Sequence, residues 1–179
     1  MLIAQQKKKE NIAEYILYMW QVEDLIRAYG FNIDALEKNV ISLFKQNEEV
    51  QKEIRDWYDN LIEMMKIEKV EERGHLQIIK NNVNDLNEFH LFLLHKQKNA
   101  KYNSLYTLAQ GNIAEFRTKS SATEHINDVE TCLTALYGVL MLKLQKKEIT
   151  KETLSATTTF SNLLAYLAAA YKAFDEEKE

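Results

Sequence analysis

The chain has 179 residues, with no proline, four glycines, one cysteine and a formal net charge of −4. A chain of this length forms one domain by the usual prior and can bury a core without disulfides or a structural metal. The small net charge comes from interleaved signs and excludes the basic face that nucleic acid requires. No apolar run approaches the roughly 18 residues of a membrane span. We therefore expect a cytoplasmic protein.

The composition favours helices throughout. Proline and glycine, the commonest helix breakers, are absent or few, whereas Leu, Lys, Glu, Gln and Ala are good helix formers. There is no strand pattern and no glycine-rich phosphate loop. We therefore predict an all-α fold, a single-domain antiparallel bundle of about six or seven helices over residues 1–174, followed by a solvated acidic tail at 175–179.

The first predicted helix covers residues 5–29 and ends at Gly30, because glycine readily adopts the left-handed conformation found at many helix ends. Its apolar residues gather on one face. At about 100° per residue, Glu23 falls inside that face, between Ile12 and Ile16, rather than opposite to it. A carboxylate in this position is the first departure from an ordinary amphipathic pattern.

Residues 33–73 form the next helical region, which begins after Asn32, a residue type that caps helices well. Asn47 lies within this region and is either a second cap or an ordinary helical residue, so one long helix and two helices both fit the sequence. The region ends at Gly74, where we expect the chain to reverse into an antiparallel neighbour.

Residues 76–98 and 100–117 form the next two predicted helices. The first carries His90 in the middle of its apolar stripe, where an imidazole needs a polar partner. Gly111 interrupts the second helix, either at some cost in stability or to let a neighbour approach closely.

The stretch 126–144 is apolar nearly all the way round, so we predict that it is the central helix, with neighbours on several sides. Residues 121–124 precede it with the Ser-Ala-Thr-Glu spacing of a capping box. Cys132 lies inside the apolar run and has no second cysteine to pair with. We interpret it as a small buried hydrophobic residue in a reducing compartment.

The last predicted helix begins at Thr150 and runs to about residue 174. Ala165, Ala169 and Ala173 recur every four residues and give this helix a flat strip beside its large apolar face. Small residues at this spacing let another backbone come close. We therefore predict that the strip is a close-packing surface, either within the bundle or in a homodimer.

Glu23, Arg27 and His90 are the best candidates for a buried polar cluster. Glu23 and Arg27 are four residues apart in the favourable order, so they can form an ion pair that apolar neighbours partly desolvate. If helices 5–29 and 76–98 are adjacent, Glu23 can also accept a hydrogen bond from His90, which would shift both pKa values. Such a cluster either serves acid/base chemistry or ligand binding, or is a satisfied structural group, and both interpretations are open.

A second enzyme hypothesis rests on Glu68-x-x-Glu71 and Asp85-x-x-Glu88. These pairs loosely resemble the paired carboxylates with which all-helical nucleotide pyrophosphohydrolases hold magnesium. Their order differs from that family's ExxE…ExxD pattern, and in a hairpin Glu88 would be displaced by about 12 Å along the helix axis. We therefore interpret these charges as a solvated face, and we predict no metal, no cofactor and no catalytic residue.

The opening residues MLIAQQKKKENIAEYILYMWQVEDLIRAYGF, followed by a wholly helical remainder, resemble an uncharacterised bacterial family catalogued as a domain of unknown function. The likeness extends over the whole chain and is most specific in this opening. It implies a bacterial cytoplasmic protein with a helical fold, and it supplies no activity, substrate or site residue.

These features favour a non-enzymatic structural or protein-interaction bundle, with a second copy or another protein as its partner and without nucleic acid or membrane. The alternative is a small-molecule-binding or catalytic bundle that uses Glu23, Arg27 and His90. An exposed apolar or alanine-lined face favours the first function. A pocket that the polar residues reach favours the second.

Overall fold

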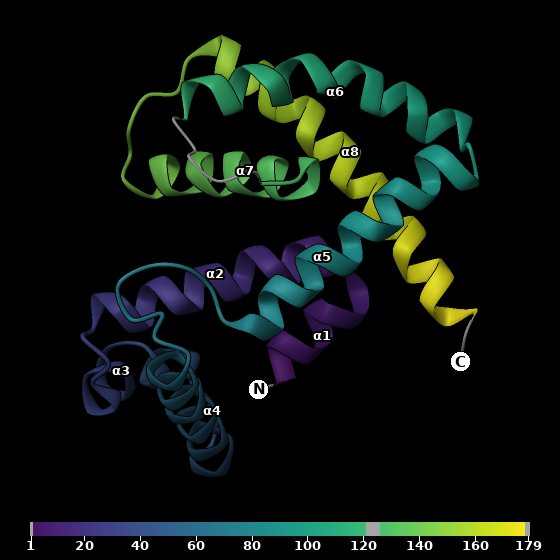
Figure 1. The fold of residues 1–179 in the computed structure, drawn as a ribbon. Helices are drawn as coiled ribbons and strands as arrows, with labels where there is room; N and C mark the ends of the chain where they lie inside the picture. The colour runs from purple at the N-terminus through teal and green to yellow at the C-terminus, as the bar shows by residue number, and fades with distance from the viewer. Residues whose placement is uncertain (1, 121–125, 178–179) are drawn as a thin grey trace. The chain divides into compact units, whose positions relative to one another are not determined.

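The structure is a computed structural model that describes residues 2–120 and 126–177. Within these residues it contains eight α-helices, one 3-10 helix, one π-helical segment and no strand, so the all-α prediction is confirmed (Figure 1). None of the described helices is both long and apolar enough to cross a membrane.

The described residues form two compact units. The N-terminal unit comprises residues 2–9 and 14–81, and the C-terminal unit comprises residues 10–13, 82–120 and 126–177. The prediction of one domain over residues 1–174 stays a prediction.

The first predicted helix is divided into α1 (Leu2–Glu10) and α2 (Ile12–Ala28). Asn11 separates them, and its side-chain oxygen accepts a hydrogen bond from the backbone N–H of Ala13 at 3.0 Å. Asparagine side chains compete in this way with the backbone bonds of a continuous helix. Beyond the end of α2, Gly30 has a φ of 60°, the left-handed conformation predicted for it.

The region 33–73 contains two α-helices, α3 (Ile33–Asn39) and α4 (Glu48–Ile67), with a 3-10 helix, η1 (Ile41–Phe44), between them. Asn32 caps α3, as predicted. Asn47 caps α4 by accepting a hydrogen bond from the backbone N–H of Val50 at 2.9 Å. The asparagine that was ambiguous in the sequence is therefore a helix start.

Helix α4 ends at Ile67, earlier than the predicted end at Gly74. Lys69 adopts a left-handed φ of 56°, and the N–H of Val70 reaches back to the carbonyl of Met65 at 3.0 Å. This is the hydrogen bonding of a Schellman turn, with lysine where glycine is usual. Three further helical segments are followed by a left-handed lysine: Lys45 after η1, Lys98 after the π segment and Lys146 after α7.

Four helices and the π segment complete the chain: α5 (Gln77–Leu91), η2 (Phe92–Lys96), α6 (Ala100–Lys119), α7 (Asp128–Leu144) and α8 (Lys151–Glu176). Only the first residues of α5 belong to the N-terminal unit. Asn99, Asn127 and Thr150 cap α6, α7 and α8 through their side chains. The capping box predicted at residues 121–124 lies outside the described residues.

Helix α7 packs against both α6 and α8 (Figure 1). Cys132 on α7 is fully buried and is a free cysteine, as interpreted from the sequence. Burial raises the pKa of its thiol to about 12, so it stays protonated and unreactive at neutral pH. The C-terminal half of α7 is less enclosed than predicted, because Leu136, Leu140 and Leu142 are only half-buried and Leu144 is exposed.

Candidate functional site

Glu23 on α2 is completely buried, with 0% of its surface exposed. Both carboxylate oxygens bind the segment between α4 and α5. Oε2 lies 2.5 Å from Nδ1 of His75, and Oε1 accepts a hydrogen bond from the backbone N–H of Leu76 at 2.8 Å. The histidine that binds this carboxylate is therefore His75, and the bond to His90, which was conditional on adjacent helices, stays a hypothesis.

The ring of His75 stacks on the indole of Trp20, with ring centroids 4.5 Å apart and an interplanar angle of 14°. A carboxylate can only accept, so Glu23 favours a proton on Nδ1 of His75. The imidazole side chain is 30% exposed. Glu23 and Trp20 thus hold the His75 ring in one orientation. The bonds from Glu23 to His75 and Leu76 also attach the start of α5 to α2.

Arg27 fastens the same segment from one turn further along α2. Its guanidinium forms an ion pair with Asp24 at 2.8 Å and donates hydrogen bonds to the carbonyls of Val70 and Gly74 at 2.9 and 2.5 Å. The structure thus brings Glu23 and Arg27 together on one segment, while the ion-pair partner of Arg27 is Asp24. We interpret both residues as anchors of the 70–76 segment.

His90 lies on the part of α5 that belongs to the C-terminal unit, and it is 1% exposed. Its Nδ1 lies 2.6 Å from the hydroxyl oxygen of Tyr102 on α6. Burial lowers the pKa of His90 to about 4, against a smaller opposing effect of the Asp128 charge and with a minor lowering by His95. Burial also raises the pKa of Tyr102. Both groups are neutral at neutral pH, which suits a structural hydrogen bond better than proton transfer.

A second polar network, which the sequence analysis missed, joins α6 to the start of α7. Asp128 accepts a hydrogen bond from the hydroxyl of Tyr106 at 2.6 Å and pairs with Arg117 at 2.8 Å. Arg117 also donates to the carbonyl of Ile126 and to the hydroxyl of Thr131. The available sequence signal was Arg117, a long cation near the end of one helix and shortly before the acidic first turn of the next.

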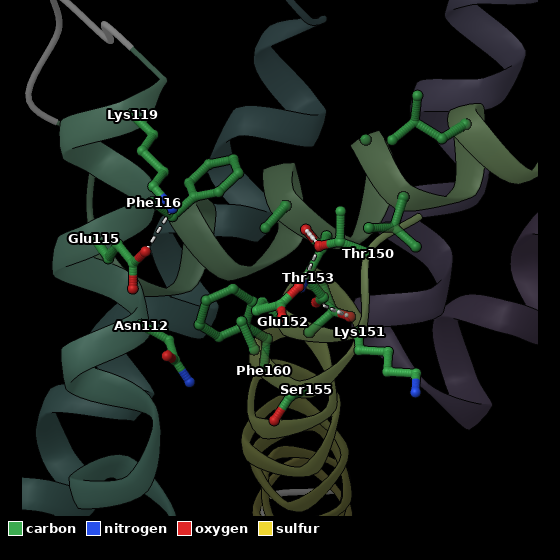
Figure 2. Close-up of a pocket in the computed structure, with 16 residues that line it drawn as sticks. Asn112, Glu115, Phe116, Lys119, Thr150, Lys151, Glu152, Thr153, Ser155 and Phe160 are labelled. Atoms are coloured by element: carbon green, nitrogen blue, oxygen red, sulfur yellow. Dashed lines mark hydrogen bonds and ion pairs between the residues drawn. The ribbon is translucent and has the colours of Figure 1, made fainter. Parts of the chain in front are cut away.

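An open pocket of about 1060 Å³ lies in the C-terminal unit, between α6, α7 and the first turns of α8 (Figure 2). Its apolar lining comes from all three helices: Phe116, Ala135, Val139, Leu142, Ala156 and Phe160. Ligand sites in proteins are typically about 300–1,000 Å³ and mainly apolar, with a few placed polar groups. The volume and lining of this pocket fit that description.

Some of the polar side chains around the pocket form hydrogen bonds or ion pairs with one another. Figure 2 shows Lys119 bonded to Glu115, one turn away on α6, at 2.5 Å. Thr150 and Thr153 share a hydrogen bond at 3.1 Å at the start of α8. The sequence analysis did not find this pocket, because its lining residues come from three helices and none is unusual on its own helix.

The alanine strip lies on the surface of α8. Ala165, Ala169 and Ala173 are all exposed in the described structure. They are therefore available to a partner, as the homodimer hypothesis requires, while their exposure shows that the C-terminal unit does not use them for its own close packing.

No group of three or more His, Cys, Asp or Glu side chains could hold a metal ion within residues 2–120 and 126–177. Glu68, the first carboxylate of the magnesium hypothesis, instead accepts a hydrogen bond from the backbone N–H of Gln77 at 2.6 Å. It caps the beginning of α5 from outside the helix.

Comparison with known proteins identifies one family. Residues 1–178 match the family described as a domain of unknown function, DUF4924. The chain belongs to this family. No curated protein and no solved structure is significantly similar to the chain. Membership confirms the resemblance noted in the opening residues and adds no activity, ligand or partner.

Proposed function

We propose that this DUF4924 protein is a non-enzymatic binding bundle whose C-terminal unit takes up an apolar small molecule between α6, α7 and α8. The observation that carries the proposal is the pocket of about 1060 Å³ with its apolar lining. The neutral state of His90 at neutral pH and the structural bonds of Glu23 support a binding role over acid/base catalysis. A cytoplasmic location stays the prediction of the sequence.

Gly138 on α7 allows a direct test, because it lines the pocket and a Cβ added there meets no atom within 4 Å. We expect N-phenyl-1-naphthylamine, an uncharged dye that fluoresces in apolar sites, to bind saturably to the native chain. Leucine at position 138 occupies part of the same space, so Gly138→Leu should weaken dye binding by about tenfold, the equivalent of ~1.4 kcal/mol. A fluorescence titration measures both.

Two variants control for effects on the helix. Gly138→Ala adds one methyl group and should leave the dye affinity within about twofold. Gly111→Leu places the same leucine at an equally open position on α6 that does not line the pocket, and should change nothing. Absence of saturable binding, or equal weakening by Gly138→Leu and Gly111→Leu, contradicts the proposed function.

A second candidate function, self-association through α8, is favoured by the exposure of its three strip alanines. We expect light scattering after size-exclusion chromatography to report about twice the chain mass of 21.0 kDa. Ala169→Lys should convert that species to monomer, because a lysine prevents close approach of two backbones. Ala114→Lys, on the exposed side of α6, is the matched control. A monomer at all concentrations rejects this candidate.

A further inference from the structure

Two uncharged polar groups at the pocket have no hydrogen-bond partner among the described residues. One is the hydroxyl of Ser155 on α8, and the other is the side-chain oxygen of Asn112 on α6. The amide nitrogen of Asn112 already donates to the hydroxyl of Thr159 at 3.1 Å. The amide oxygen of Asn112 therefore remains available as an acceptor. Figure 2 shows Asn112 and Ser155 on two different helices at one end of the pocket.

The charges of the lining are balanced. It contains two lysines, Lys119 and Lys151, and two glutamates, Glu115 and Glu152. The backbone at the start of α8 and the hydroxyl of Thr150 lower the pKa of Glu152, with a smaller effect of Lys119. The positive end of α8 is therefore already occupied by a carboxylate of the chain itself.

This balance disfavours a charged ligand head of either sign. A carboxylate head would lie near Glu115 and Glu152, and an ammonium head would lie near Lys119 and Lys151. Glu115 and Lys119 already pair with each other, and the remaining lysine, Lys151, is an exposed side chain next to Glu152, so a charged head of either sign gains little. A neutral head needs only hydrogen bonds, and Asn112 and Ser155 offer one acceptor and one hydroxyl.

We infer that the ligand of this pocket is an uncharged amphiphile, with an apolar body against Phe116, Val139 and Phe160 and a hydroxyl head between Asn112 and Ser155. The head donates to the Asn112 oxygen and accepts from the Ser155 hydroxyl. This inference rests on the proposed function, since it names the chemical class of the molecule that the pocket takes.

The test is displacement of N-phenyl-1-naphthylamine from the full chain by three homologous series: n-alkanols, n-alkanoates and n-alkylammonium ions. For the alkanols we expect the dissociation constant to fall about fourfold per added CH₂, the equivalent of ~0.8 kcal/mol, until the pocket is filled. At equal chain length, the alkanol should bind about tenfold more tightly than either ion, because it gains the two hydrogen bonds of the neutral head.

Two substitutions test the position of the head. Asn112→Leu and Ser155→Ala should each weaken alkanol binding by about threefold to tenfold and leave the dependence on chain length unchanged. Gln110→Leu, at an exposed position of α6 that does not line the pocket, is the matched control and should have no effect. Ser155 is exposed, so its alanine variant should fold even if Asn112→Leu does not.

The outcomes separate this inference from the proposed function. Binding of an alkanoate or an alkylammonium ion as tightly as the alkanol overturns the inference, and so does the absence of any effect of Asn112→Leu and Ser155→Ala. Dye binding that depends on Gly138 but is not displaced by any alkanol also overturns it, while the proposed function stands. Failure of the dye itself to bind overturns both.

Discussion

Glu23→Ala is expected to lower the free energy of unfolding by about 2–4 kcal/mol. The substitution leaves the N–H of Leu76 without its acceptor, removes the partner of His75 Nδ1 and opens a cavity at a site with no solvent access. In a chain of this length, such a loss corresponds to a fall of roughly 5–15 °C in melting temperature. Urea unfolding followed by circular dichroism and a thermal scan measure the two quantities.

Two variants make this experiment specific. Glu23→Gln retains an oxygen for Leu76 and nearly the same side-chain volume, so it should cost only about 1 kcal/mol. Glu14→Ala, at an exposed position on the same helix, should stay within about 0.5 kcal/mol of the native chain.

Trypsin should cut after Lys69 and Arg73 faster in Glu23→Ala than in the other variants, because only in Glu23→Ala does the segment between α4 and α5 lose its anchor. Equal stability of Glu23→Ala and Glu14→Ala would contradict the anchor interpretation.

The stability of the chain is expected to fall by about 2 kcal/mol between pH 7 and pH 5 through His90 alone. In the folded state the pKa of His90 is about 4, whereas the unfolded chain has the ordinary value of 6.5. Between these values the unfolded state binds the proton and the folded state does not. The contribution is therefore fully present above about pH 6.5 and is lost as the pH falls toward 4. Urea unfolding at pH 7, 6 and 5 measures the slope.

His90→Gln should remove most of this slope, because glutamine does not titrate and can still reach the hydroxyl of Tyr102. His95→Gln is the matched control, since His95 is exposed five residues away and only slightly lowers the pKa of His90. The charge of Asp128 opposes the effect of burial, but the folded state already holds His90 deprotonated between pH 7 and pH 5, so Asp128→Asn should leave the contribution of His90 to this slope nearly unchanged while it weakens the pairing with Arg117. A slope that survives in His90→Gln belongs to other groups and refutes this prediction.

Helix starts could be predicted from the sequence because the chemistry that fixes them is local. Asn32 and Thr150 lie at N-caps where a short polar side chain accepts the unsatisfied backbone N–H groups of the first turn, and the sequence is sufficient to recognise that arrangement. Asn11 and Asn47 act in the same way, but no proline or glycine accompanies them. For this reason one of these breaks was missed and the other was left open.

Partners across helices could not be predicted, because they depend on packing. Glu23 was correctly recognised as lying on an apolar face, yet its partner, His75, lies 52 residues away in a segment with no periodic signal. The pocket likewise depends on how the helices pack against one another. Phe116, Val139 and Phe160 each fit the core pattern of a different helix, and the pocket that they line together exists only once the three helices have packed.

The left-handed lysines that follow four helical segments have an evolutionary consequence. A residue with a Cβ in this conformation is disfavoured by roughly 1–2 kcal/mol relative to glycine, so Lys45, Lys69, Lys98 and Lys146 each hold local strain. Replacement of any of them by glycine would relax that strain without altering the core. Such replacements would raise the free energy of unfolding. The added stability would offset destabilising substitutions elsewhere, including substitutions in the pocket lining that adapt it to a different ligand.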